Sequence, residues 1–372
     1  VPYLVIFKII KSISIFVIKK NTIMKKNTPF KSVLTAICLS LLSIGALAQE
    51  NEVIAQPPTE MVNITPVVFK NQTSGFQLAG VIYTPIKMKK SDHLPAVVVQ
   101  GPMGSTKEQT ASLYAQLLAE KGFVTMVYDY SYLGSSEGQP RAYEDPTIKA
   151  TDINSAVAFI TKYPNVDKNK IFAVGICGSG VYLPYAVTLA KSSPLKAIAV
   201  VNPFEMIHFV APNGKSEAQL LSEKKLYEEK GIVTRVNLIE EGSEGAEYYY
   251  NSKRGATPNW LPFASWSELS WRKFFPAQEV KKLHTPFLVI AGENAFTRQG
   301  AELMYNNAAT NSKEFFVVPK ARHFDMYDKE IYISVIIPKI ITFFNQFCNI
   351  SVSEKSLNFS FNYCISFLNF CT

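Results

Sequence analysis

Cysteine and histidine are scarce in this 372-residue sequence, which contains five cysteines and four histidines. Between Gln49 and Gln346 the one cysteine is Cys177. A region of that length with a single thiol has no disulfide framework, and it cannot form a cysteine-rich zinc site. The histidines do not have the pairwise spacing of metal ligands either. We therefore expect no metal and no cofactor, and we expect the lone thiol to have a specific role.

Acidic residues are absent from residues 1–48, which carry seven lysines. These lysines account for most of the formal net charge of +8, so the rest of the chain is close to neutral. A nucleic-acid-binding domain would need a basic surface of its own. The sequence therefore predicts no nucleic-acid partner.

Residues 24–48 have the three parts of a signal peptide. A basic start at Met24-Lys25-Lys26 leads into a mostly apolar stretch at residues 33–47, and Ala46-Leu47-Ala48 is a small-x-small cleavage site. The apolar stretch is short for a membrane-spanning helix. We expect cleavage after Ala48 and export to the periplasm or the medium, with no stable membrane span afterwards.

Two flanking segments do not resemble the rest of the chain. Residues 1–23 are rich in Ile, Val and Lys, and we interpret them as upstream sequence that precedes the true start at Met24. An extra membrane anchor is the alternative, which Lys8 and Lys11 disfavour. Residues 347–372 are rich in Asn, Ser, Phe and Cys without a period, and we interpret them as an atypical tail.

Apolar runs alternate with helix-like segments between residues 60 and 346, which we predict to form one domain. Helices are expected at residues 112–121 and 148–162. Alternating strands and helices predict a mostly parallel sheet covered on both faces, with its site at the carboxyl ends of the strands. We predict strands at residues 61–70, 76–84, 95–100, 123–128, 170–174, 196–201, 286–291 and 314–318.

Residues 205–280 interrupt this alternation. They contain a charged helical stretch at residues 216–230 and all three tryptophans of the chain, Trp260, Trp266 and Trp271. An aromatic insertion at this place predicts a cap over a pocket, with Trp260 and Trp266 in its lining. The alternative is that these rings only pack the insertion onto the body.

The segment Gly175-Ile176-Cys177-Gly178-Ser179-Gly180 follows an apolar run and precedes a helix-like one. Small residues around one reactive side chain predict a tight strand-to-helix turn with the nucleophile at its tip. Here that position holds Cys177, whose thiol ionises more readily than a serine hydroxyl. The alternative role for Cys177 is a small buried hydrophobe.

A cysteine nucleophile needs a base, and His323 is the best candidate. It follows the last predicted strand, as the histidine does in the nucleophile–acid–histidine order of hydrolases. His208 is the second choice, whereas His93 lies in a polar loop and His284 lies at the entry to a strand.

Acyl transfer also needs hydrogen-bond donors for an oxyanion. The loop at residues 100–105 follows a strand, and its Pro102 has no N–H group. The backbone amides of Met103 and Gly178 are therefore the predicted pair.

The sequence resembles the α/β-hydrolase superfamily, in its dienelactone-hydrolase-like branch, over about residues 60–345. The resemblance implies an eight-stranded sheet and attack by Cys177 on an ester, a lactone or a similar acyl group. The matching pieces include Lys107-Glu108-Gln109-Thr110, Tyr128-Asp129-Tyr130, Gly134-Ser135-Ser136-Glu137-Gly138, Gly175-Ile176-Cys177, Arg254-Gly255-Ala256, Pro258-Asn259-Trp260 and His323-Phe324-Asp325-Met326-Tyr327-Asp328.

One departure from this resemblance concerns the acid of the triad. An aspartate is expected a few residues after Gly292, where this chain has Ala295 and Phe296. Glu293 is the nearest acid, and Glu205 is a second candidate. A Cys–His pair can work without a strong third member, because histidine alone can ionise a thiol.

Together these features predict an exported hydrolase that acts on a small-molecule ester or lactone through Cys177 and His323. One alternative is a binding or accessory protein that has kept the fold and lost catalysis. A thiol redox protein is the other, and it is weaker because Cys177 has no C-x-x-C partner. The oligomeric state stays open.

Overall fold

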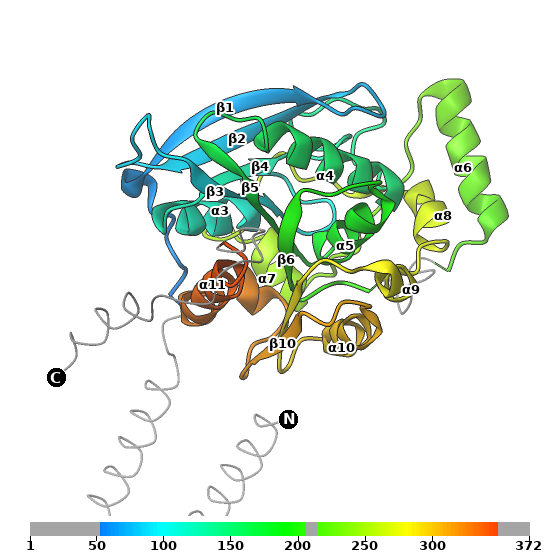
Figure 1. The fold of residues 1–372 in the computed structure, drawn as a ribbon. Coiled ribbons are helices and arrows are strands. Elements are labelled where there is room, and N and C mark those ends of the chain that lie inside the picture. The colour runs from blue at the N-terminus through cyan, green and yellow to red at the C-terminus, as the bar shows by residue number, and fades with distance from the viewer. Residues whose placement is uncertain (1–52, 206–213, 349–372) are drawn as a thin grey trace, which may run out of the picture. The chain divides into compact units, whose positions relative to one another are not determined.

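Eight strands form one sheet in the computed structural model, which describes residues 53–205 and 214–348 (Figure 1). Their order is β1-β2-β4-β3-β5-β6-β9-β10. β2 pairs antiparallel with β1 and with β4. The other six strands, β4, β3, β5, β6, β9 and β10, run parallel to one another. The predicted sheet is confirmed. Its strands are β1 (Val62–Lys70), β2 (Gln77–Pro85), β3 (Leu94–Gln100), β4 (Val124–Tyr128), β5 (Val166–Ile176), β6 (Leu195–Val201), β9 (Phe287–Gly292) and β10 (Lys313–Val318).

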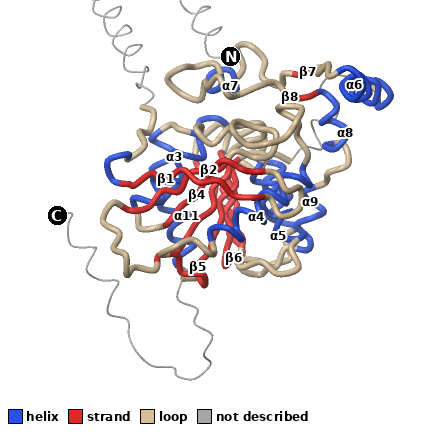
Figure 2. The backbone as a smooth tube through the Cα atoms, turned by 90° about the horizontal axis from the view of Figure 1, so that it is seen from above, coloured by secondary structure: helices blue, strands red, loops and turns tan. Residues whose placement is uncertain are grey.

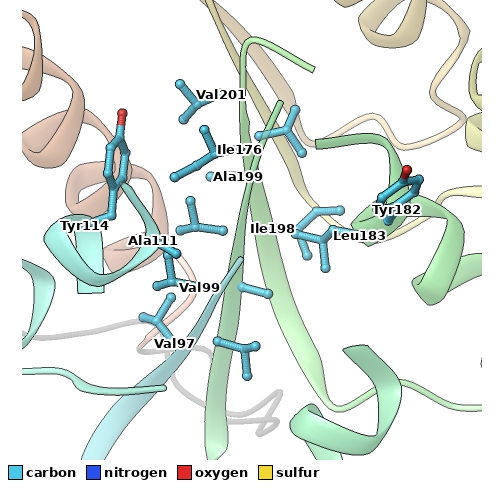
Figure 3. Packing of buried hydrophobic residues seen from close by; sticks show 14 of the residues in the cluster. Val97, Val99, Ala111, Tyr114, Ile176, Tyr182, Leu183, Ile198, Ala199 and Val201 are labelled. Carbon is cyan, nitrogen blue, oxygen red and sulfur yellow. The ribbon is translucent and has the colours of Figure 1, made fainter. Parts of the chain in front are cut away.

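Helices cover both faces of this sheet. α3 (Thr110–Glu120) and α11 (Glu330–Asn345) lie on one face, and α4 (Pro146–Ile160) and α5 (Ser179–Leu189) lie on the other (Figure 1). α10 (Arg298–Asn307) packs against β9 and β10. The central strands are apolar runs because neighbours bury them on both sides. Figure 3 shows this core, with side chains of β3, β5 and β6 between Tyr114 of α3 and Tyr182 of α5.

The predicted insertion carries small elements of its own, and we use the name cap for its described part, residues 214–280. Figure 2 shows α6, α7, β7 and β8 together on one side of the strands. α6 begins at a capping box formed by Ser216 and Gln219 and ends at Gly231, which has a left-handed backbone. The cap contains α6 (Glu217–Lys230), β7 (Arg235–Val236), α7 (Glu244–Tyr249), β8 (Phe263–Ala264), η3 (Ser265–Ser267), α8 (Glu268–Trp271) and α9 (Pro276–Glu279), and η4 (Val280–Lys282) follows it.

Several predictions fall on residues that the structure does not describe. These are the upstream segment at residues 1–23, the signal peptide at residues 24–48, His208, and nearly all of the tail at residues 347–372. Among the described residues, no helix has the length and apolar character needed to cross a membrane.

Asn202 joins the ends of three strands. It follows β6, and its side-chain amide donates to the carbonyl of His323 at 3.0 Å, while its carbonyl accepts from Gly292 N at 2.8 Å. Its side chain is completely buried. Since buried polar groups must find partners, this one amide holds the loop after β10 against β6 and β9.

We expect Asn202→Ala to lower the free energy of unfolding by about 2–4 kcal/mol, because two buried backbone groups lose their partners. Chemical denaturation measures this change. The matched control is Asn63→Ala on the exposed side of β1, where a change of no more than about 0.5 kcal/mol is expected. Equal effects of the two substitutions would show that the Asn202 bridge contributes nothing.

Candidate active site

The predicted elbow is present between β5 and α5. Cys177 has a positive φ of 55°, a strained conformation for a residue with a side chain. Its N–H donates to Val201 O at 2.9 Å, and its carbonyl accepts from Gly180 N at 2.9 Å. A Cβ added at Gly175 would lie 2.2 Å from Ser179 O. The flanking glycine is therefore required by the close approach of helix and strand.

The thiol of Cys177 faces the two predicted oxyanion amides. The backbone N–H groups of Met103 and Gly178 and the hydroxyl of Tyr327 all hydrogen-bond to its ionised form and lower its pKa. Burial outweighs them and raises the pKa of Cys177 to about 11. A Cβ at Gly178 would lie 2.6 Å from Met103 N, so the missing side chain allows the two amides to converge. The structure thus brings the Met103 amide to the elbow that carries Cys177 and Gly178, which were predicted from two separate segments.

His323 lies after β10, at the same edge of the sheet as Cys177, as predicted. Its side chain is completely buried, and Phe296 packs on the ring with centroids 4.5 Å apart. Burial disfavours the imidazolium and lowers the pKa of His323 to about 3. The imidazole is therefore neutral at physiological pH.

Two hydroxyls partner this imidazole, and no carboxylate among the described residues is hydrogen-bonded to it. Nδ1 lies 2.8 Å from Oγ1 of Thr297, and Nε2 lies 3.0 Å from the hydroxyl of Tyr327. Thr297 is buried at the start of α10, in the loop after β9 where the acid of a triad was expected. Sequence reasoning missed both residues. The signals that could have found them are a hydroxyl in the acid's loop and a tyrosine one helical turn after the histidine.

Glu293 and Glu205 do not hold this histidine, so both predictions for the acid are wrong. The exposed carboxylate of Glu293 accepts from Lys320 N at 2.8 Å. Glu205 is buried against α10, where a Cβ at Gly300 would lie 2.8 Å from its own Cβ. In the described part of the chain, hydroxyls lie at both ring nitrogens of His323, with Thr297 at Nδ1 and Tyr327 at Nε2.

A cavity of about 460 Å³ lies between the strand ends and the cap. It is mostly apolar and aromatic, as small-molecule pockets usually are. Residues of the predicted insertion form part of its wall. From the strand ends it is lined by Met103, Cys177, Phe204, Phe296 and His323, and from the cap by Leu238, Tyr249, Trp260, Phe263 and Trp271.

The tryptophans divide between the pocket and the packing of the cap. Trp260 lines the cavity, as predicted, and stacks on Tyr249 with centroids 5.1 Å apart. Trp266 does not line it, so that prediction is wrong. Its buried ring stacks on Tyr227 of α6 at 5.4 Å and fixes that helix to the rest of the cap. Trp271 takes the place in the lining that was expected of Trp266.

A buried ion pair connects the cap to the turn that follows His323. Arg254 donates to both oxygens of Asp328, at distances of 2.5–3.1 Å, and to Phe324 O at 3.1 Å. Two segments of the family resemblance, Arg254-Gly255-Ala256 and the one from His323 to Asp328, thus meet here. The second of them contains the short helix η5 (Phe324–Tyr327).

A family model described as X-Pro dipeptidyl-peptidase (S15 family) matches residues 74–325, which include Cys177, the cap and His323. The chain belongs to this S15 family. The uncharacterized protein PA2218 of Pseudomonas aeruginosa is 33% identical to it over 296 residues, covering 73% of this chain and 78% of that protein. The crystal structure of PA2218 matches 80% of this chain and 98% of its own, with a TM-score of 0.70.

Two further proteins are similar in sequence to this S15 chain. The uncharacterized protein YcjY of Escherichia coli is 30% identical over 290 residues, covering 72% of this chain and 94% of that protein. The polyketide transferase claH of Penicillium crustosum is 26% identical over 256 residues, covering 63% and 82%. The family and the fold confirm the predicted α/β-hydrolase superfamily, and they identify the chain as a hydrolase of that superfamily.

Among the described residues of this S15 protein, no group of three His, Cys, Asp or Glu side chains is placed to hold a metal ion. The groups that the structure places at the site are the thiol, the imidazole, two hydroxyls and two backbone amides beside one apolar cavity.

We expect alkylation of Cys177 to be slow at pH 7 and to accelerate with pH through pH 9, because only the thiolate reacts and the folded pKa is about 11. Peptide mapping after timed iodoacetamide labelling separates Cys177 from the other cysteines, and Cys177→Ser identifies its peptide. Fast labelling at pH 7 that is independent of pH would contradict this, since it would indicate a preformed thiolate–imidazolium pair.

Proposed function

We propose that this S15-family protein is an acyl hydrolase that cleaves small esters and lactones through a thioester on Cys177. The observation that carries the proposal is the position of the thiol, which lies on two convergent backbone amides at the base of an apolar cavity. Donors fixed at that place stabilise the oxyanion of an acyl group bonded to the sulfur. A structural cysteine has no need of this arrangement.

In the first half-reaction, the sulfur of Cys177 attacks the acyl carbon while its proton passes toward His323. The amides of Met103 and Gly178 bind the oxyanion. The tetrahedral intermediate collapses as the C–O bond to the alcohol breaks, and the proton held by His323 goes to the departing oxygen. A thioester remains on Cys177, and water activated by the same imidazole attacks it to release the acid and the thiol.

The resting site is uncharged in this mechanism. With a raised thiol pKa and a lowered imidazole pKa, proton transfer occurs together with attack on the acyl carbon and not before it. His323 is consequently available as a base at any physiological pH. The thiol is also protected from oxidants and alkylating agents until an acyl substrate fills the cavity, because its protonated form is unreactive.

The cavity wall favours uncharged acyl groups. Its acidic side chains are Glu240, Glu244 and Glu268, and Arg272 is paired with the last of these at 2.7 Å. A carboxylate on the substrate would therefore meet negative charge and little available positive charge. Neutral aryl esters and lactones are the substrate class that this lining supports, within the dienelactone-hydrolase-like chemistry that the sequence resembles.

Acyl transfer to an acceptor other than water is a second candidate function. The relative from Penicillium crustosum is named a polyketide transferase, and an apolar cavity of this size can hold an acceptor beside the acylated sulfur.

We also propose that the protein is exported, on the basis of the signal peptide at residues 24–48. Fractionation of cells that express the full chain tests this localisation.

The decisive experiment is a panel of neutral aryl esters, lactones and a Gly-Pro anilide, run on the wild type and on Cys177→Ala. We expect ester or lactone turnover that falls at least about 10³-fold in Cys177→Ala, and a covalent acyl adduct on Cys177 by mass spectrometry. Turnover of the anilide alone would identify a peptidase instead. Full activity in Cys177→Ala, or no turnover of any substrate, would contradict the proposal.

We expect the wild-type kcat/KM to be independent of pH from about pH 7 down to about pH 4, because His323 stays neutral there. Thr297→Asp places an anion beside Nδ1 and should raise the pKa of His323, so that activity now falls as the pH drops toward 4. Thr297→Val, which removes the hydroxyl without adding charge, is the control and should keep the flat profile. A wild-type acid limb near pH 6.5 would contradict the lowered pKa.

A further inference from the structure

The hydroxyl of Tyr327 lies between the nucleophile and the base. It is 3.0 Å from Nε2 of His323, and it lies close enough to Cys177 to lower the pKa of the thiol as a hydrogen-bond donor to its ionised form. Among the residues that the structure describes, no hydrogen bond joins Cys177 directly to His323. A mechanism in which His323 takes the thiol proton therefore has to account for this oxygen.

The ring of Tyr327 is fixed in this position. It is completely buried, and Tyr248 packs against it edge-on with centroids 5.0 Å apart. The backbone carbonyl of Tyr327 accepts a hydrogen bond from Oγ1 of Thr110 at 2.7 Å. Next to it, Asp328 is bound by Arg254. A ring held from several sides is not placed to swing aside and let the imidazole reach the sulfur.

The hydrogen bond at Nδ1 of His323 selects the tautomer in which Nε2 can accept a proton. Nδ1 lies 2.8 Å from Thr297, whose hydroxyl can accept the Nδ1 proton. In that tautomer Nε2 carries no proton and accepts from Tyr327. The Tyr327 hydroxyl then donates to Nε2 and offers its lone pairs to the thiol.

On the basis of the proposed function, we propose that Tyr327 is a catalytic residue that relays the proton from Cys177 to His323. As the sulfur attacks, the S–H bond breaks and its proton bonds to the Tyr327 oxygen. In the same step the original Tyr327 O–H bond breaks and its proton bonds to Nε2. Tyr327 is neutral before and after the step, and the imidazolium holds the proton that the leaving alcohol later receives.

A relay of this type suits a buried site. Burial raises the pKa of Tyr327 well above its usual range, so the hydroxyl does not become a phenolate at rest. It exchanges one proton for another without carrying net charge, which a low-dielectric surrounding favours. After the relay the hydroxyl carries the former thiol proton, which it can donate toward the ionised sulfur, as the two amides do.

The test is Tyr327→Phe, which keeps the ring and its packing and removes only the hydroxyl. We expect kcat/KM for a neutral aryl ester to fall about 10²-fold, the size of one lost acid–base contact, with the circular-dichroism spectrum unchanged. A proton inventory in H₂O/D₂O mixtures should show two protons in flight in the wild type and fewer in the variant. The control is Tyr83→Phe, which removes a buried hydroxyl 2.9 Å from Oγ of Ser112 and should keep wild-type turnover.

The outcomes separate this proposal from the proposed function. If Cys177→Ala is inactive while Tyr327→Phe has wild-type or higher activity, the relay is wrong and the thiol mechanism stands. If Cys177→Ala is active, the thiol mechanism itself is wrong. In a double variant with His323→Ala, removal of the Tyr327 hydroxyl should cost nothing further, because both residues act on one proton. Independent, additive losses would overturn the relay.

Discussion

The structure of the site depends on one strained turn. Cys177 has a left-handed backbone, and strand β5 and helix α5 approach so closely that a side chain at Gly175 would collide with Ser179 O. A second close approach, of the loop after β3, places Met103 N where a side chain at Gly178 would lie. A relaxed turn at this point would move the sulfur away from both amides. The oxyanion site, the nucleophile and the edge of the cavity therefore have one common cause.

Burial sets the charge states of the two titratable groups near this turn. It raises the pKa of Cys177 and lowers that of His323, so both groups are uncharged at neutral pH. A carboxylate at the position of Thr297 would have to be buried as well, at a large desolvation cost unless it were paired. A threonine hydroxyl keeps this pocket neutral. The Thr297 and Tyr327 hydroxyls beside the imidazole are consistent with one uncharged site, as the proposed mechanism requires.

Local patterns in the sequence predict the fold and half of the site. Cys177, Met103 and His323 each follow a strand, and parallel strands bring their carboxyl ends to one edge, so their meeting could be predicted from order alone. Thr297 could not, because its role depends on which atom of a loop meets Nδ1, and sequence position does not fix that to within a residue. Trp266 was misassigned because composition shows that a cap is aromatic and does not show which rings face the cavity.

The cap is bound to η5, the short helix that carries Tyr327. η5 begins directly after His323, supplies Phe324 to the cavity wall and carries Tyr327. The cap holds this short helix from two sides, through Arg254 on Asp328 and through Glu244, which accepts from Phe324 N at 2.6 Å. A substrate that packs under the cap therefore presses on the same turn that aligns the proton path. In the proposed mechanism, this turn is where binding of the acyl group under the cap and activation of the thiol would be coupled, because the cap contacts the segment that carries Tyr327.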